Sequence, residues 1–307
     1  MHVRQHLGAL QIQKLQVVHL AELYAKLLRE GRRPRRPRNA GATVPKAPKA
    51  APASGLSART VGHVHRVLHK ALRVAVEWGI TQRNVADIAR PPKVEGREIA
   101  SLSEAQATDL IQKLRGRTLY PIAVVGLATG MRRGELLALR WRDVDFDAGK
   151  LRVEQSMEQT KAGLRFKAPK TRQGRRTITL PASVVTELRA HWTAQQEHRL
   201  RLGAGKAPND ALVFSNWDGT PRSPNAITRE WARTLARIKL PKISLHALRH
   251  THVSQLIASG MDVLTISRRL GHSKPTTTLN EYGHLFGNSD DRAAQVIEAA
   301  FGKALTE

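Results

Sequence analysis

The sequence predicts a mainly α-helical protein with a small antiparallel β-sheet, an α+β fold in two domains. Along most of the 307 residues, apolar side chains recur at helical spacing between residues that cap helices. Only between residues 145 and 180 does the period fall to two, as in short strands. A proline-initiated polar stretch over 91–100 indicates a linker between domains. We therefore expect a helical domain over residues 1–96 and a second domain over 101–307.

The first domain is predicted to hold two main helices with a basic linker between them. One helix lies within residues 1–30 and breaks at Gly31. Residues 32–54 are rich in proline and basic side chains, which block regular structure and offer little apolar surface, so we expect a flexible linker. Ser57 then caps a helix that runs to about Trp78. The basic side chains of this helix suit contacts with phosphates.

The second domain is predicted from its caps, turns and periodicity. Ser101 and Ser103 are both suited to cap its first helix, and an apolar helix from Tyr120 ends at Gly130. Three short antiparallel strands are expected over 150–153, 164–167 and 176–180. Further helices are expected from Val184, Ala226, Leu245 and Asp262, the last ending at Gly271. Trp231 is expected in the core, with its indole N–H as a second candidate for a phosphate contact.

The composition indicates a polyanionic partner. Lys and Arg number 51 against 25 Asp and Glu, a formal net charge of +26, which favours nucleic acid over a membrane surface. No apolar run approaches the roughly 20 residues that span a bilayer, and no secretory signal is visible at the start. The absence of cysteine excludes disulfides and thiolate zinc sites. We expect a soluble, cytoplasmic, DNA-facing protein without a membrane partner.

Four residues near the C-terminus have the chemistry needed to transfer a phosphoryl group to a phenol. His246 and Arg249 lie three apart on one helix and point the same way, His272 follows the next helix, and Tyr282 comes ten residues later. A guanidinium matches two phosphate oxygens, and a histidine can donate to an oxygen or exchange a proton. A tyrosine can attack as a nucleophile and form a covalent intermediate. Their order and spacing together point to this reaction.

These segments resemble those of a known enzyme family. HALRH, LGHS and the segment of Tyr282 are similar to the second signature box of the tyrosine recombinases, the phage integrase family. ATGMRRGELLALRWRDVD resembles the first box and aligns Arg132 with the catalytic arginine. Lys170, in APKTRQGRRTITL, stands where the family has its catalytic lysine, on a β-hairpin. Glu135, three residues after Arg132, is suited to hold that arginine in place.

The resemblance implies a site-specific recombinase that acts without metal or cofactor. The implied site consists of Arg132, Lys170, His246, Arg249, His272 and Tyr282. The two arginines would clamp the scissile phosphate, and Tyr282 would attack it to give a 3′-phosphotyrosyl link and a free 5′-hydroxyl. Lys170 would protonate the departing oxygen, while the two histidines assist proton movement and oxygen binding.

The resemblance also implies an assembly on double-stranded DNA. Residues 1–96 would form the core-type DNA-binding domain, and the extra arm-binding domain of longer integrases is not expected. Strand exchange would need a homo-tetramer on paired sites, formed from chains that are monomers in solution. Apolar residues within 292–305 recur at helical spacing. We expect them to form a tail helix, packed on its own domain or donated to a neighbouring protomer.

Three alternatives compete with this interpretation. His246, His250 and His252 crowd one helix, but no HExxH glutamate separates the first two and no third zinc ligand is evident, so no metal is expected. His250 is instead expected to hydrogen-bond within its helix or to the backbone. A type IB topoisomerase uses similar chemistry without pairing sites. A non-catalytic DNA-binding protein is disfavoured because all six implied positions are filled.

Overall fold

The computed structural model describes residues 2–31, 55–94, 101–169, 171–286, 294–295 and 297–301. The chain divides into two compact units, residues 1–98 and 99–307. The predicted basic linker over 32–54 and Lys170 lie outside the described residues, as does part of the predicted linker between domains. Within the described residues, no helix combines the length and the apolar character needed to cross a membrane.

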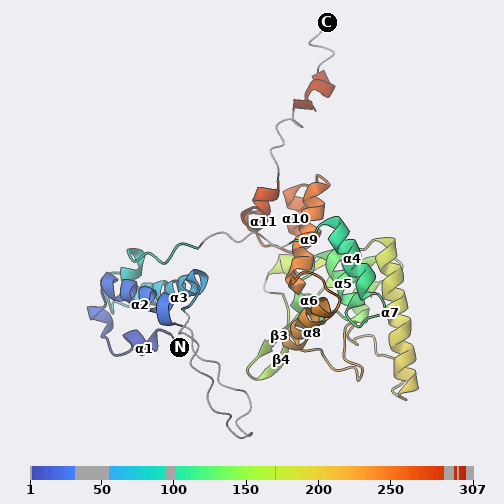
Figure 1. The fold of residues 1–307 in the computed structure, drawn as a ribbon, viewed down its shortest axis with the longest axis horizontal. Helices are drawn as coiled ribbons and strands as arrows, with labels where there is room; N and C mark the ends of the chain where they lie inside the picture. The colour runs from blue at the N-terminus through green and yellow to red at the C-terminus, as the bar shows by residue number, and fades with distance from the viewer. Residues whose placement is uncertain are drawn as a thin grey trace. The chain divides into compact units, whose positions relative to one another are not determined.

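The first unit is a small helical bundle (Figure 1). Its elements are α1 (Arg4–Leu7), η1 (Ile12–Lys14), α2 (Val17–Glu30), α3 (Ala58–Glu77) and η2 (Val85–Asp87). The hydroxyl oxygen of Ser57 accepts the N–H of Thr60, so α3 begins at the predicted cap. Side chains from α2, α3 and the η2 segment share one core, made of Leu20, Leu23, Tyr24, Leu27, Val61, Leu72, Val85, Ala86 and Ala89.

Helix α3 presents a basic face on the side away from this core. Its exposed side chains include Arg59, His63, Arg66, Lys70 and Arg73. Their alternating separations of four and three residues place them along one side of the helix. The apolar side chains that α3 buries lie on the opposite side, which leaves a continuous basic stripe facing solvent.

The second unit is built mainly from helices, as predicted (Figure 1). These are α4 (Glu104–Leu114), α5 (Tyr120–Thr129), α6 (Arg133–Leu137), α7 (Ala182–Arg201), α8 (Pro224–Arg237), α9 (Leu245–Ala258), α10 (Val263–Leu270) and α11 (Pro275–Tyr282), with 3-10 turns η3 (Trp141–Asp143), η4 (Arg172–Gly174) and η5 (Gly283–Leu285). Ser103, rather than Ser101, caps α4 in a capping box with Gln106. Gly130 and Gly271 end α5 and α10 in the left-handed conformation, with φ of 62° and 68°.

The strands form two separate sheets, where we expected one set of three. Strands β1 (Val144–Asp145), β2 (Lys150–Val153) and β5 (Arg176–Thr179) pair antiparallel in the order β1-β2-β5. Strand β4 (Gly163–Lys167) pairs instead with β3 (Ser156–Thr160), which the alternation did not reveal. Four of the five β4 residues are exposed and none is buried. This hairpin projects beyond the helices as a two-stranded ribbon (Figure 1).

A single large core holds the helices of the second unit against the three-stranded sheet. Helix α5 is apolar on nearly all sides and packs along α9, which carries two of the predicted site residues. Trp231 of α8 is 1% exposed and its indole N–H donates to the carbonyl of Ile243 at 3.0 Å. The core position predicted for the ring is therefore confirmed, and the indole N–H is not free for a phosphate.

Candidate active site

Five of the six predicted site residues are described, and they come from four segments of the second unit. Arg132 caps α6, while His246 and Arg249 lie on α9. His272 follows the C-terminal glycine of α10, and Tyr282 is the last residue of α11. Lys170 lies outside the described residues.

Arg249 is held at the C-terminal ends of two helices. Its guanidinium donates to the carbonyl of Gly130 at 2.7 Å and to that of Leu270 at 3.1 Å. Carbonyls at a helix C-terminus lack intrahelical partners and carry partial negative charge, so they suit a guanidinium. Burial and the charge of Arg132 lower the pKa of Arg249 to about 10, which leaves it charged at neutral pH. The side chain is 2% exposed and fixed before any ligand arrives.

His272 completes the surroundings of this guanidinium. Its Nε2 lies 2.7 Å from Arg249 Nη2, and its Nδ1 lies 2.8 Å from the hydroxyl of Thr278. Because an arginine can only donate, Nε2 accepts the hydrogen bond from Arg249. The imidazole proton is therefore on Nδ1, which donates a hydrogen bond to the Thr278 hydroxyl. Burial and the charges of Arg249 and Arg132 lower the pKa of His272 to about 4. The imidazole is therefore neutral at physiological pH and orients the arginine.

Arg132 is oriented by Glu135, as the sequence predicted. The carboxylate accepts the backbone N–H of Arg132 at 3.0 Å and its guanidinium at 2.9 Å. Arg176, which the sequence analysis did not single out, donates to the same carboxylate at 2.9 Å and to the carbonyl of Arg269 at 2.7 Å. Burial opposes ionisation of Glu135, but the charge and hydrogen bond of Arg176 and the contacts of Arg132 hold its pKa below the usual value. The carboxylate is therefore an anion between two cations.

Tyr282 lies in an apolar cluster, although its neighbours in sequence are polar. The ring is 0% exposed and packs with Val253, Ile266 and Leu270. Burial and the charge of Glu281 raise the pKa of the phenol, while Arg249 opposes that shift by its charge and a hydrogen bond. The hydroxyl therefore stays protonated in the free chain and lies beside the buried arginine.

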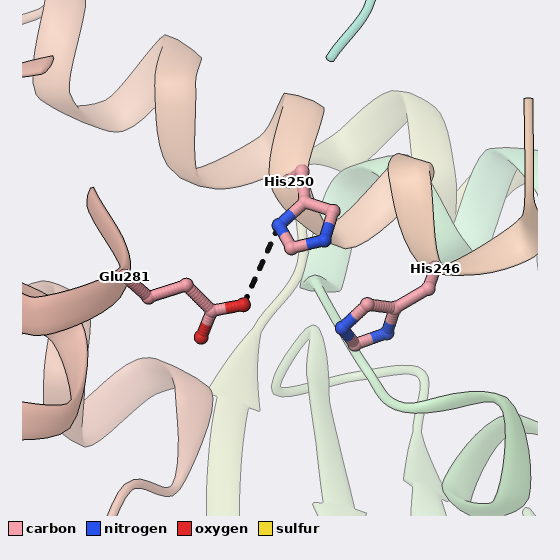
Figure 2. Close-up of side chains that lie close together, drawn as sticks. All are labelled: His246, His250 and Glu281. Carbon is pink, nitrogen blue, oxygen red and sulfur yellow. Dashed lines mark ion pairs between the residues drawn. The ribbon is translucent and has the colours of Figure 1, made fainter. Parts of the chain in front are cut away.

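His250 contacts this hydroxyl, so the role expected for it was wrong. Its Nδ1 lies 2.7 Å from the Tyr282 oxygen, whereas we expected a bond within its helix or to the backbone. Figure 2 shows the imidazole of His250 between Glu281 and His246, and the His250 Nδ1–Glu281 Oε1 distance is 3.8 Å. The potential metal-ligating atoms of these three residues lie within 4.8 Å of one another. Glu281 is therefore the third candidate zinc ligand that was not evident from the sequence. Arg249 contributes positive charge to this cluster, which disfavours a cation there.

A cavity of about 420 Å³ opens beside Arg132. Its lining includes Arg132 and His272, and also Lys167, Pro169 and Thr171. A cavity with a partly exposed guanidinium and a second, buried guanidinium behind His272 is suited to a phosphate group. The arrangement can thus bind an anion beside Arg132 and His272, whereas the buried Tyr282 does not line this cavity.

Comparisons with known proteins agree with this chemistry. Residues 94–288 match the phage integrase family, which is more than half of the chain. The chain belongs to the phage integrase family. It is a tyrosine recombinase, a class of enzymes that break and rejoin DNA strands.

Relatives and solved structures support the assignment over most of the chain. A tyrosine recombinase XerC-like protein of Caldanaerobacter subterraneus subsp. tengcongensis is 28% identical over 80% of this chain and 68% of its own length. The Tn1549 transposon integrase in complex with transposon right-end DNA superposes with a TM-score of 0.74 at 20% identity, over 98% of this chain and 90% of that one. A chain of the λ integrase tetramer bound to a Holliday junction superposes with a TM-score of 0.57 at 17% identity, over 89% of this chain and 66% of that one. Both structures share the fold of this recombinase.

Proposed function

We propose that this recombinase cuts and rejoins specific DNA sites with Tyr282 as the nucleophile. One observation carries the proposal: the Tyr282 oxygen lies 2.7 Å from His250 on α9, and Arg249 of the same helix, fixed at two helix ends, contacts His272 at the cavity. A phosphate in that cavity would meet Arg132 and His272. No other described tyrosine has such surroundings, since Tyr24 is hydrogen-bonded to His65 in the first unit and Tyr120 begins α5.

The reaction follows from these contacts. Arg132 and Arg249 stabilise the charge that develops on the phosphate oxygens in the transition state. The Tyr282 oxygen bonds to phosphorus as the bond to the 5′-oxygen breaks, which leaves a 3′-phosphotyrosyl link. His246 is proposed to bind an oxygen and move protons, and His272 to hold Arg249 in position. The link conserves the phosphodiester energy, so a 5′-hydroxyl of a partner strand can reverse the step.

Lys170 is proposed as the acid that protonates the 5′-oxygen. Its chain neighbours, Pro169 and Thr171, both line the cavity that Arg132 and His272 line. The leaving oxygen of an in-line displacement needs a proton, and the resemblance of the segment APKTRQGRRTITL to the family assigns that role to Lys170. Lys167 also lines the cavity, but it is paired with Glu158 across the hairpin.

The first unit is proposed as a core-type DNA-binding domain over residues 1–96. The basic stripe of α3 runs for 15 residues from Arg59 to Arg73, about 22 Å at 1.5 Å per residue. A helix with such a face can lie along the phosphates of a groove and supply affinity that does not depend on base sequence. Specific sites would then be distinguished by other contacts.

Recombination is proposed to require a tetramer on paired sites, assembled in the cytoplasm from chains that are monomers before they bind. The λ integrase tetramer on a Holliday junction supports this stoichiometry. Residues 294–295 and 297–301 are helical, and the side chains of Ile297 and Phe301 are more than half exposed. Exposed apolar groups on a tail helix favour its donation to a neighbouring protomer over packing on its own domain.

The decisive experiment replaces the nucleophile by Tyr282→Phe. We expect normal DNA binding and no covalent adduct on labelled, nicked site DNA in a denaturing gel, because the phenyl ring lacks the attacking oxygen. A persistent adduct would refute the assignment of Tyr282. Relaxation of a supercoiled plasmid that lacks any recombination site would instead favour the type IB topoisomerase alternative.

A further inference from the structure

The contact between α9 and α11 assigns a partner to the Tyr282 proton. His250 Nδ1 and the Tyr282 oxygen are 2.7 Å apart, and their rings are 5.6 Å apart between centroids. Tyr282 is completely buried, so water does not compete for this hydrogen bond. His246, by contrast, is exposed on the next turn of α9, with its ring edge-on to His250 (Figure 2).

The direction of this hydrogen bond follows from the charges around it. The ionisable groups that face His250 are His246 and Arg249 on its own helix and Glu281 on α11. Burial and the charges of His246 and Arg249 lower the pKa of His250 to about 4, so the imidazole is neutral at pH 7. The phenol is also neutral, because burial raises its pKa. A neutral phenol donates and a neutral Nδ1 accepts.

We propose that His250 is the general base that removes the proton of Tyr282 as the phenol attacks the scissile phosphate. The O–H proton moves to His250 Nδ1, the phenol oxygen bonds to phosphorus, and the bond from phosphorus to the 5′-oxygen breaks. The 5′-oxygen takes its proton from Lys170. In the reverse step, the imidazolium returns its proton to the departing Tyr282 oxygen. This inference rests on the proposed role of Tyr282.

Proton transfer from Tyr282 to His250 would occur only when DNA is bound. In the free chain both pKa shifts keep the proton on oxygen. A phosphate anion beside Arg249 favours the imidazolium of His250, because an opposite charge stabilises the charged form. The base therefore becomes effective only when the substrate is bound.

The test measures single-turnover cleavage of a nicked site that traps the covalent adduct. His250→Ala should slow adduct formation by ~100-fold or more, in the range typical of general-base removal. His250→Asn should be similarly slow, because its amide oxygen can accept the hydrogen bond but cannot take the proton. His284→Ala is the matched control, since His284 is an exposed histidine two residues after Tyr282. It should cleave like the wild type.

Replacing tyrosine by a more acidic phenol tests whether His250 acts as a base or only supports the structure. The chain has three tyrosines, so difluorotyrosine can replace all of them biosynthetically. Cleavage by His250→Ala should then recover substantially, because a stronger acid needs less help to lose its proton. The acid limb of the wild-type pH profile should be absent from the His250→Ala profile.

Three results would overturn the proposal. Wild-type rates in both His250 variants would show that the base is elsewhere. Faster cleavage would show that His250 restrains Tyr282, and losses in both variants without rescue by the fluorinated phenol would show a structural role. Adduct formation by Tyr282→Phe would refute the proposed function itself, whatever the His250 variants do. If His250→Ala melts early, His250→Asn carries the same comparison.

Discussion

The two sides of the cavity are built in different ways. The arginine clamp, which consists of Arg132, Glu135, Arg176, Arg249 and His272, rests on the main core, and most of its side chains are buried. Its arginines donate to carbonyls at helix ends or to a buried carboxylate. The β3–β4 hairpin, which precedes Lys170, is a two-stranded ribbon whose β4 side chains are mostly exposed. The hairpin is anchored through β3, whose Met157 is 3% exposed and packs in the main core.

The burial of the clamp suits the stabilisation of charge on a phosphate. Charge stabilisation is most effective when the donors are fixed before the reaction, because no energy is then spent on orienting them. The clamp meets that condition in the free chain. The β3–β4 hairpin shares the main core through Met157 of β3, but most of its β4 side chains are exposed.

The largest effect is expected where the clamp loses its buried anion. Glu135→Gln leaves Arg176, which is 6% exposed, without a counter-charge. Removing one partner of a buried ion pair typically costs about 3–5 kcal/mol. The melting temperature of the second unit should fall by about 2–4 °C for each kcal/mol, as measured by calorimetry.

The hairpin offers the matched control for this variant. Glu158→Gln removes the carboxylate that pairs with Lys167, and both side chains are about one-third exposed. Exposed pairs contribute roughly 0–1 kcal/mol. Equal destabilisation by Glu135→Gln and Glu158→Gln would contradict the distinction between a buried ion pair in the clamp and a part-exposed one on the hairpin.

Local features of this architecture could be predicted from the sequence, whereas its long-range contacts could not. Gly130 and Gly271 act within one turn of their own helices, so their residue types suffice to predict helix ends, and Ser103 was one of two predicted caps. The contact of His250 with Tyr282 spans 32 residues and that of Arg176 with Glu135 spans 41. No periodicity links such positions. They follow from how α9 meets α11 and how β5 meets α6.

The next effect concerns charge stabilisation by the clamp itself. Arg249→Ala should slow cleavage by roughly 100–1000-fold, as for a lost oxyanion-hole donor, and weaken DNA binding far less. Arg249→Lys should recover little, because one ammonium cannot serve two helix-end carbonyls and His272 in a planar fork. Cleavage rates at saturating enzyme and gel-shift titrations give the two quantities. Equal losses in both would make Arg249 an ordinary phosphate contact.

The smallest of these effects is the loss of cleavage rate expected for Lys170→Ala, and a modified substrate should reverse it. Lys170→Ala should slow cleavage by ~100-fold, the lower end for loss of a general acid. A site with a 5′-sulfur at the scissile position should restore its rate, because a thiolate leaves without a proton. Arg249→Ala should not be restored by that substrate, since the clamp acts on phosphate charge.

Lys167→Ala is the control, as Lys167 also lines the cavity but is paired with Glu158. Rescue of Lys167→Ala instead of Lys170→Ala would move the acid three residues back, onto β4 itself. The proposed proton donor would then be a residue of the hairpin that is paired with Glu158 in the free chain.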